Sequence, residues 1–129
     1  MREGTGVRRH LTLVGLLLLA GCAGSSGTAA TPPPDERGAI SITATDDFRF
    51  VPAAVTAHPG QVRIVLKNTG SYPHNISFPD LHVTSKTVSG TPGSTATELL
   101  LTVAKPGRYR FVCTFHDQAG MTGSLDVTS

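Results

Sequence analysis

The sequence predicts an all-β domain, a Greek-key β-sandwich or barrel of roughly seven or eight strands. Short segments rich in β-branched and apolar residues recur along the chain, and clusters of Pro, Gly, Ser and Thr separate them. No window of about eleven residues or more shows the apolar period of a helix. Short strands at this spacing, in a folded unit of about 90 residues, are typical of a β-sandwich.

The expected strands follow one another between turn signals, and the chain has no internal repeat. They span residues 40–45, 48–51, 62–68, 74–78, 99–103, 109–113 and 121–127, with one further short strand expected at a sheet edge. Turns are expected around residues 59–60, 69–71, 91–93 and 105–107, where Pro and Gly interrupt the apolar segments.

Residues 1–21 are interpreted as an export signal rather than as part of the fold. Arg2, Arg8 and Arg9 precede an apolar run over residues 11–20 that is too short to span a membrane. The run ends at Leu-Ala-Gly-Cys22, which resembles the lipobox of bacterial lipoproteins. That resemblance implies a lipid on Cys22 as the first mature residue, and an anchor on the outer face of the bacterial cytoplasmic membrane. A plain secretory signal is the alternative, and the arginine pair leaves Sec and twin-arginine export both open.

Residues 22–38 are small, polar and proline-rich, which predicts a tether between the lipid and a domain at residues 39–129. The full chain has a formal charge of +2, and removal of residues 1–21 leaves equal numbers of acidic and basic side chains. Without a basic stripe, nucleic-acid binding is not expected.

The chain has 2 cysteines, Cys22 and Cys113. If Cys22 carries lipid, Cys113 is an unpaired thiol in an oxidising compartment. Burial or metal ligation is the usual protection for such a thiol. Alone, Cys113 would more often be a small buried hydrophobe than a ligand.

Strand parity places Cys113 and Met121 on the core side of the last two strands. Side chains alternate between the two faces of a strand, so Met121 shares a face with the apolar Leu125, and Cys113 shares one with Phe111. Because Cys113 ends one strand and Met121 begins the next, an antiparallel connection brings both to the same end of the sandwich.

His116 is expected at that end, and His74 joins it if the topology brings the turn before His74 to the same pole. His74 shares its parity with Ile76 and follows the turn over residues 69–73, while His116 lies in the loop over residues 114–120. A thiolate, two imidazoles and a weak thioether suit copper in electron-transfer sites, because this mixed set accommodates both Cu(I) and Cu(II).

The segment from Gly107 to Gly123, with its Cys-x2-His-x4-Met spacing, resembles the ligand loop of plastocyanin-like cupredoxins. The motifs Phe-Arg-Phe-Val-Pro52, Pro-Gly60 and Pro-His74-Asn extend the likeness to residues 40–128. The resemblance implies a type 1 centre with one copper ion, in which His74, Cys113 and His116 are the strong ligands and Met121 the axial one. It also implies that Asn75 ties the two ligand loops together by hydrogen bonds, with Thr114 as a further supporting residue.

The function implied by the resemblance is single-electron transfer between redox partner proteins, by a chain that is not an enzyme and is a monomer. A copper-handling protein is the alternative, although the single methionine of the mature chain argues against it. An oxidase would need a further copper cluster, and the sequence has no His-x-His pair. A metal-free interaction domain is the last alternative.

The roles of several residues near the predicted site do not follow from the sequence. His58 and His82 lie in turn or loop sequence and are expected to be exposed. Tyr72, Pro73 and Phe115 could form an apolar surface around His116 or simply pack. The role of Asp117, next to His116, is not predicted.

Overall fold

The computed structural model describes residues 38–90 and 95–129. The predicted signal over residues 1–21, the lipid attachment at Cys22 and all but the last residue of the tether lie outside the described residues and stay predictions. No helix in the described ranges is long and apolar enough to cross a membrane.

The described chain contains nine strands and two single-turn 3-10 helices. The strands are β1 (Ile40–Thr45), β2 (Arg49–Val51), β3 (Ala54–Ala57), β4 (Gly60–Asn68), β5 (Ser77–Phe78), β6 (Val83–Thr84), β7 (Ala96–Val103), β8 (Gly107–Val112) and β9 (Thr122–Val127), and the 3-10 helices are η1 (Pro79–Leu81) and η2 (Asp117–Ala119). The all-β prediction is therefore confirmed. The number of strands exceeds the expected seven or eight, because the structure has two short edge strands, β3 and β6, and only one further edge strand was expected.

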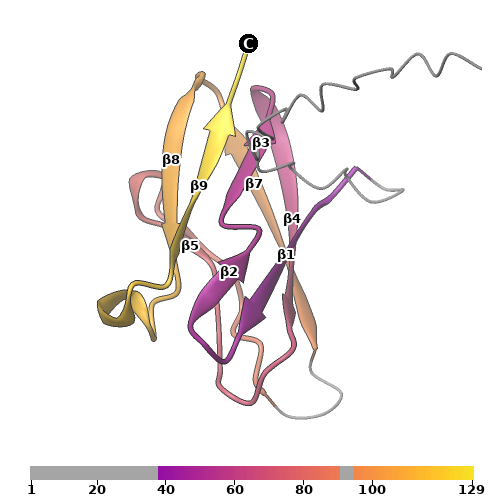
Figure 1. The fold of residues 1–129 in the computed structure, drawn as a ribbon. Coiled ribbons are helices and arrows are strands. Elements are labelled where there is room, and N and C mark those ends of the chain that lie inside the picture. The colour runs from indigo at the N-terminus through magenta and orange to yellow at the C-terminus, as the bar shows by residue number, and fades with distance from the viewer. Residues whose placement is uncertain (1–37, 91–94) are drawn as a thin grey trace, which may run out of the picture.

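The strands form two mixed sheets that pack face to face (Figure 1). One sheet has the order β2-β1-β4-β7, and the other has the order β3-β9-β8-β5-β6. β1 pairs with β4 in parallel and β3 with β9 in parallel, whereas the other pairs are antiparallel. Parallel neighbours need crossovers between the sheets, which is consistent with a Greek-key sandwich.

The core lies between the sheets and consists of the inward residues of each strand. In β1 the buried residues alternate with partly exposed ones, as the period of two requires. Phe111 packs against Phe50 at a ring-centroid distance of 5.2 Å and against Phe78 at 5.4 Å. A Cβ at Gly123 would lie 2.3 Å from the Phe111 ring, so this position requires glycine. Burial of a large apolar side chain such as Phe111 stabilises the fold by about 1.5–3 kcal/mol.

The segment over residues 74–78 differs from the strand that the sequence predicts. Only Ser77 and Phe78 belong to β5, and His74 is joined to the sheet region by an isolated bridge with Val88. All five residues from 74 to 78 are buried, so polar and apolar positions do not alternate between core and solvent here. Burial of both faces removes the contrast on which parity depends.

One end of the sandwich collects the segments that carry the predicted ligands. The β8–β9 connection with η2, the β4–β5 loop and the β1–β2 turn lie at the lower end in Figure 1, opposite the C-terminus. The fold thus brings residues distant in sequence to one pole.

Candidate metal centre

Cys113 and Met121 face each other where β8 ends and β9 begins. The backbone N–H of Cys113 donates to the carbonyl of Met121 at 3.1 Å, which continues the β8–β9 pairing by one step. Both side chains are fully buried and belong to the core cluster. The expectation that they meet at one end of the sandwich is correct.

His116 is held in a short loop that folds back on itself. Its N–H donates to the carbonyl of Cys113 at 3.1 Å, and its carbonyl accepts from the N–H of Met121 at 3.2 Å. Between them Gly120 caps the end of η2, and its φ of +83° lies in the left-handed region that glycine adopts without steric cost. The loop is therefore compact, and His116 lies over the Cys113–Met121 pair.

His74 reaches the same place from the segment before β5, the strand that pairs with β8. Its N–H donates to the carbonyl of Val88 at 3.0 Å, and its carbonyl accepts from the N–H of Val88 at 2.8 Å. The His74 side chain is fully buried. This reciprocal pair fixes the backbone from which the imidazole projects.

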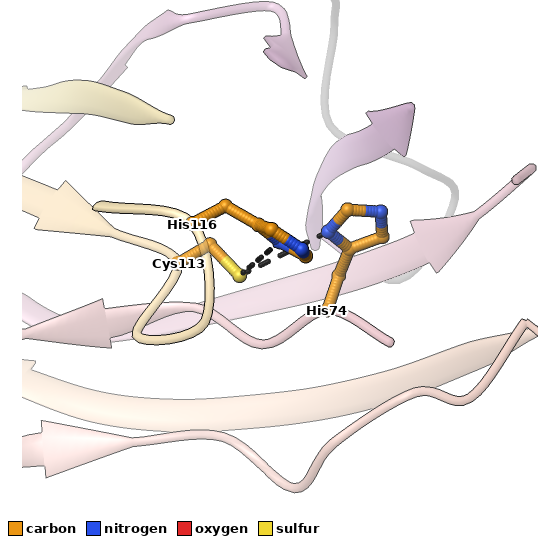
Figure 2. A group of neighbouring side chains, drawn as sticks. All are labelled: His74, Cys113 and His116. Atoms are coloured by element: carbon orange, nitrogen blue, oxygen red, sulfur yellow. Dashed lines mark hydrogen bonds between the residues drawn. The ribbon is translucent and has the colours of Figure 1, made fainter. Parts of the chain in front are cut away.

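Three potential ligand atoms converge at this pole (Figure 2). The Nδ1 atom of His116 lies 3.5 Å from the sulfur of Cys113, and Nδ1 of His74 lies 3.8 Å from it. The ligand atoms of His74, Cys113 and His116 all lie within 4.8 Å of one another. Across residues 38–90 and 95–129, this is the one group of three or more His, Cys, Asp or Glu side chains that could hold a metal ion.

The donor set fits copper. A soft sulfur and two ring nitrogens converge on one space, and Met121, whose side chain is buried, is joined to Cys113 by a backbone hydrogen bond. His74, Cys113, His116 and Met121 are thus positioned to form a copper site.

Asn75 and Thr114 connect the two loops beside the site. The Asn75 side-chain amide donates to Oγ1 of Thr114 at 2.8 Å, and its Oδ1 accepts from the N–H of Thr114 at 2.9 Å. Because Asn75 follows His74 and Thr114 follows Cys113, these bonds hold the backbones of two candidate ligands at a set separation.

Burial lowers the pKa of His74, and the neighbouring His116 lowers it further, while the carboxylate of Asp46 opposes the shift. A neutral imidazole, the form that binds metal, is therefore favoured at position 74. Its Nε2 is buried and finds no hydrogen-bond partner among the described residues. Metal-binding histidines usually donate from this second nitrogen, so the orientation of the His74 ring depends on packing and on its backbone.

Aromatic rings surround His116, which remains partly exposed. Tyr72 and Phe115, both about half exposed, lie at centroid distances of 6.1 Å and 6.3 Å from the imidazole. Phe48 lies much closer, stacked at 4.3 Å and an interplanar angle of 19°. The contact of Phe48 with His116 was not predicted. Phe48, Arg49 and Phe50 alternate between apolar and charged side chains, as the residues of a strand do.

Phe48 lies in a turn instead of a strand, with a φ of +57° in the left-handed region. Its N–H donates to the carbonyl of Thr45 at 3.1 Å. The acidic pair Asp46-Asp47 directly before it was the available signal, because such residues favour turns.

The remaining polar residues named above lie on the surface. Asp117 accepts a hydrogen bond from Arg110 at 2.7 Å, which ties η2 to β8. His58 and His82 are exposed, as expected, and Nδ1 of His58 lies 2.9 Å from the carbonyl of Thr128. Neither contributes to the cluster at the pole.

The chain resembles known proteins over most of its length. Residues 12–127 match the family described as Cupredoxin-like domain. A plastocyanin from Rumex obtusifolius is 32% identical over 89 residues, which cover 60% of this chain and 86% of the relative. The plastocyanin minor isoform, chloroplastic, of Arabidopsis thaliana is 35% identical over 96 residues, or 67% of this chain, and this chain spans only 56% of its length.

Solved structures share the fold. Dithionite-reduced auracyanin from Roseiflexus castenholzii has a TM-score of 0.58 at 18% identity and covers 69% of this chain and 95% of its own. A mutant fern plastocyanin, described in oxidized and reduced form, has a TM-score of 0.53 at 23% identity and covers 68% and 99%. A reduced Cu(I) form of an amicyanin variant has a TM-score of 0.55 at 20% identity and covers 70% and 83%.

Proposed function

This chain belongs to the cupredoxin-like domain family, and from that premise we propose that it carries single electrons by means of one copper ion. The ion is held by His74, Cys113 and His116, with Met121 as a weaker fourth ligand. When bound, it would supply the change between Cu(I) and Cu(II). The observation that carries the proposal is the convergence of one sulfur and two Nδ1 atoms at one pole of the sandwich.

The chain's own residues would keep the ligand geometry nearly constant between the two oxidation states. Cys113 and Met121 project from paired backbone, His74 is held by its bridge to Val88, and Asn75 joins the two loops. A framework that does not rearrange suits fast electron transfer, because a rearrangement would add to the barrier. The partly exposed edge of His116 offers partner proteins their nearest approach to the site.

Burial favours this function over copper handling. Cys113, His74 and Met121 are fully buried, whereas a site that delivers copper needs its ligands open to an acceptor. The relatives described in oxidized and reduced forms are consistent with a redox role. The proposal also holds that the chain is not an enzyme and acts as a monomer between separate donor and acceptor proteins.

Copper-loaded protein tests the function directly. We expect an intense visible band from charge transfer between the Cys113 sulfur and Cu(II), together with a type 1 EPR spectrum. Cys113→Ser should bind copper weakly and lack the band, since it replaces the soft sulfur. A colourless wild type with full copper content would contradict the proposal.

The proposed location is the outer face of the bacterial cytoplasmic membrane, through a lipid on Cys22. The support is the lipobox-like Leu-Ala-Gly-Cys22 and the apolar run before it. Cys22→Ser should move the protein from the membrane fraction to the soluble exported fraction. Retention of the variant on the membrane would contradict lipid attachment.

A further inference from the structure

We infer that the β1–β2 turn, which carries no candidate ligand, positions both histidine loops: Asp46 for His74 and Phe48 for His116. The inference deepens the proposed function and rests on it for the role of copper. Both residues are positioning residues, because neither offers a ligand atom to the site.

Asp46 holds the loop that leads into His74. Its Oδ1 accepts from the backbone N–H of Ser71 at 2.7 Å and from that of Tyr72 at 3.2 Å. Hydrogen bonds to a carboxylate are stronger than those between neutral groups. A Cβ at position 70 would lie 2.0 Å from Asp46 Oδ1. Only glycine at this position therefore lets the loop come this close to the carboxylate.

This external support matters because Nε2 of the His74 ring has no orienting hydrogen bond from residues 38–90 or 95–129. Asn68 holds the loop from the core side, accepting from the N–H of Gly70 at 2.9 Å and donating to the carbonyl of Tyr72 at 2.8 Å. Asp46 supplies the corresponding contacts from the solvent side. The backbone before His74 is therefore held from both sides.

Phe48 acts on the other histidine. Its ring is the closest of the rings around His116 and the only nearly parallel one among the described aromatic pairs. A left-handed backbone at a bulky residue is unfavourable, and a turn selected for its backbone alone would have Gly or Asn there. Such strain at a functional site supports a role for the side chain.

The two contacts belong to one rigid turn. Asp46 and Phe48 are two residues apart, and the Thr45 hydroxyl holds the turn by donating to Asp47 and by contacting the carbonyl of Arg49 at 3.2 Å. Through Asp46 the turn holds the His74 loop at Tyr72, and through Phe48 it orients the imidazole ring of His116. It sets the relative position of two ligands without contributing one.

Metal-free protein tests the Asp46 half without copper. In Asp46→Ala we expect the Ser71 and Tyr72 amides to exchange with deuterium about ten-fold faster or more, since both lose a charge-assisted bond. Asp46→Asn keeps an acceptor oxygen and should lie between. Asp126→Ala is the matched control, because it removes the same charge from β9, where the carboxylate pairs with Arg108 and takes no part in the turn. Equal exchange in Asp46→Ala and the wild type would overturn this half.

A series at position 48 tests the other half. Phe48→Leu removes the ring, Phe48→Gly also suits the left-handed backbone, and Phe48→Tyr keeps the ring. In metal-free protein, the first two should abolish the upfield ring-current shift of the His116 ring protons, whereas Phe48→Tyr should retain it. Phe115→Leu is the control, because that exposed ring lies near His116 without stacking on it. Unchanged His116 shifts in Phe48→Leu would overturn the stacking role.

Copper-loaded protein then shows whether the turn matters to the centre. We expect a chelator to remove Cu(II) about ten-fold faster from Asp46→Ala and Phe48→Leu than from the wild type, because their ligand loops open more often. The reduction potential should shift in these variants, and it should not shift in Asp126→Ala. A wild type without a blue band would contradict the proposed function, but it would not affect the amide-exchange result. A normal blue centre with unaltered release and potential in both variants would sink this inference alone.

Discussion

His74 and His116 present the same ring nitrogen to the same sulfur, yet the protein holds them in opposite ways. His74 is fully buried, and its backbone is fixed by reciprocal hydrogen bonds with Val88. His116 is partly exposed, lies in a short turn and is surrounded by aromatic rings.

The difference separates two requirements of an electron carrier. Buried hydrogen bonds hold one ligand in place, because an unpaired polar group in the core would be costly. Aromatic packing holds the other where a partner can approach it, since stacked rings need no burial to orient each other. Each of the following experiments would break or sharpen this contrast.

The largest effect is expected on replacing the histidines themselves. In copper-loaded His116→Gly, free imidazole should restore the visible band quickly, because the vacated space opens to solvent. In His74→Gly, restoration should be slower by a factor of about ten or more, because entry requires local opening of the core. Stopped-flow absorbance after imidazole addition measures both rates. Equal rates would mean that the two positions are equally accessible.

Asn68→Ala should lower the free energy of unfolding by about 2–4 kcal/mol, because it removes three hydrogen bonds from a buried side chain to the backbone around His74. The lost bonds are those to Gly70, Tyr72 and the buried carbonyl of Val88, which accepts at 3.1 Å. Denaturant unfolding of metal-free protein measures the change. Phe115→Ala, on the exposed side of His116, is the comparison and should cost far less. A similar loss in both would remove the distinction.

The stability of metal-free protein should fall as the pH is lowered below the ordinary histidine pKa of about 6.5. Burial lowers the pKa of His74, so the unfolded chain takes up a proton at this position before the folded chain does. The stabilisation is complete above that pH and is lost progressively below it. Unfolding curves at pH 7.5 and 5.5 test the sign, and His74→Leu should flatten the difference. A wild type that is no less stable at the lower pH would contradict it.

The smallest effect is expected at Asp117. Its bond to Arg110 joins two partly exposed side chains, and such pairs contribute up to about 1 kcal/mol and often nothing measurable. Asp117→Asn should therefore leave the unfolding free energy almost unchanged, as chemical denaturation can show. A loss comparable to that of Asn68→Ala would place a main support of His116 in this ion pair instead of in the rings.

Much of this architecture could be predicted from local pattern. Cys113 directly follows β8 and Met121 directly precedes β9, so the antiparallel connection brings them together as expected, although Phe111, Val112 and Cys113 are all buried and parity does not separate their faces. The sequence argument also brings His74 to this pole, although the strand predicted over residues 74–78 is mostly absent. These residues are buried on both faces and show no alternation. The Val88 bridge that replaces the strand joins segments whose pairing no local pattern reveals.

Asp46 and Phe48 illustrate what pattern cannot supply. Their contacts run from the β1–β2 turn to the β4–β5 connection, which joins the two sheets, and to the β8–β9 loop of the second sheet, so they depend on how the whole chain packs. Phe48 also alternates as a strand residue would, and a left-handed bulky residue is too rare to expect. The parts that tertiary packing decides are the supports around the ligands, whereas the ligands themselves follow from spacing.

The direction of β1 has a consequence for how the molecule faces its surroundings. β1 begins at Ile40 and runs toward the pole that holds His116, so the start of the folded domain lies some 20 Å from that pole, the length of a six-residue strand (Figure 1). A chain restrained at residues before Ile40 would therefore turn the pole with His116 outward from the point of attachment. A soluble donor or acceptor could then reach the imidazole edge without the domain having to tilt or detach.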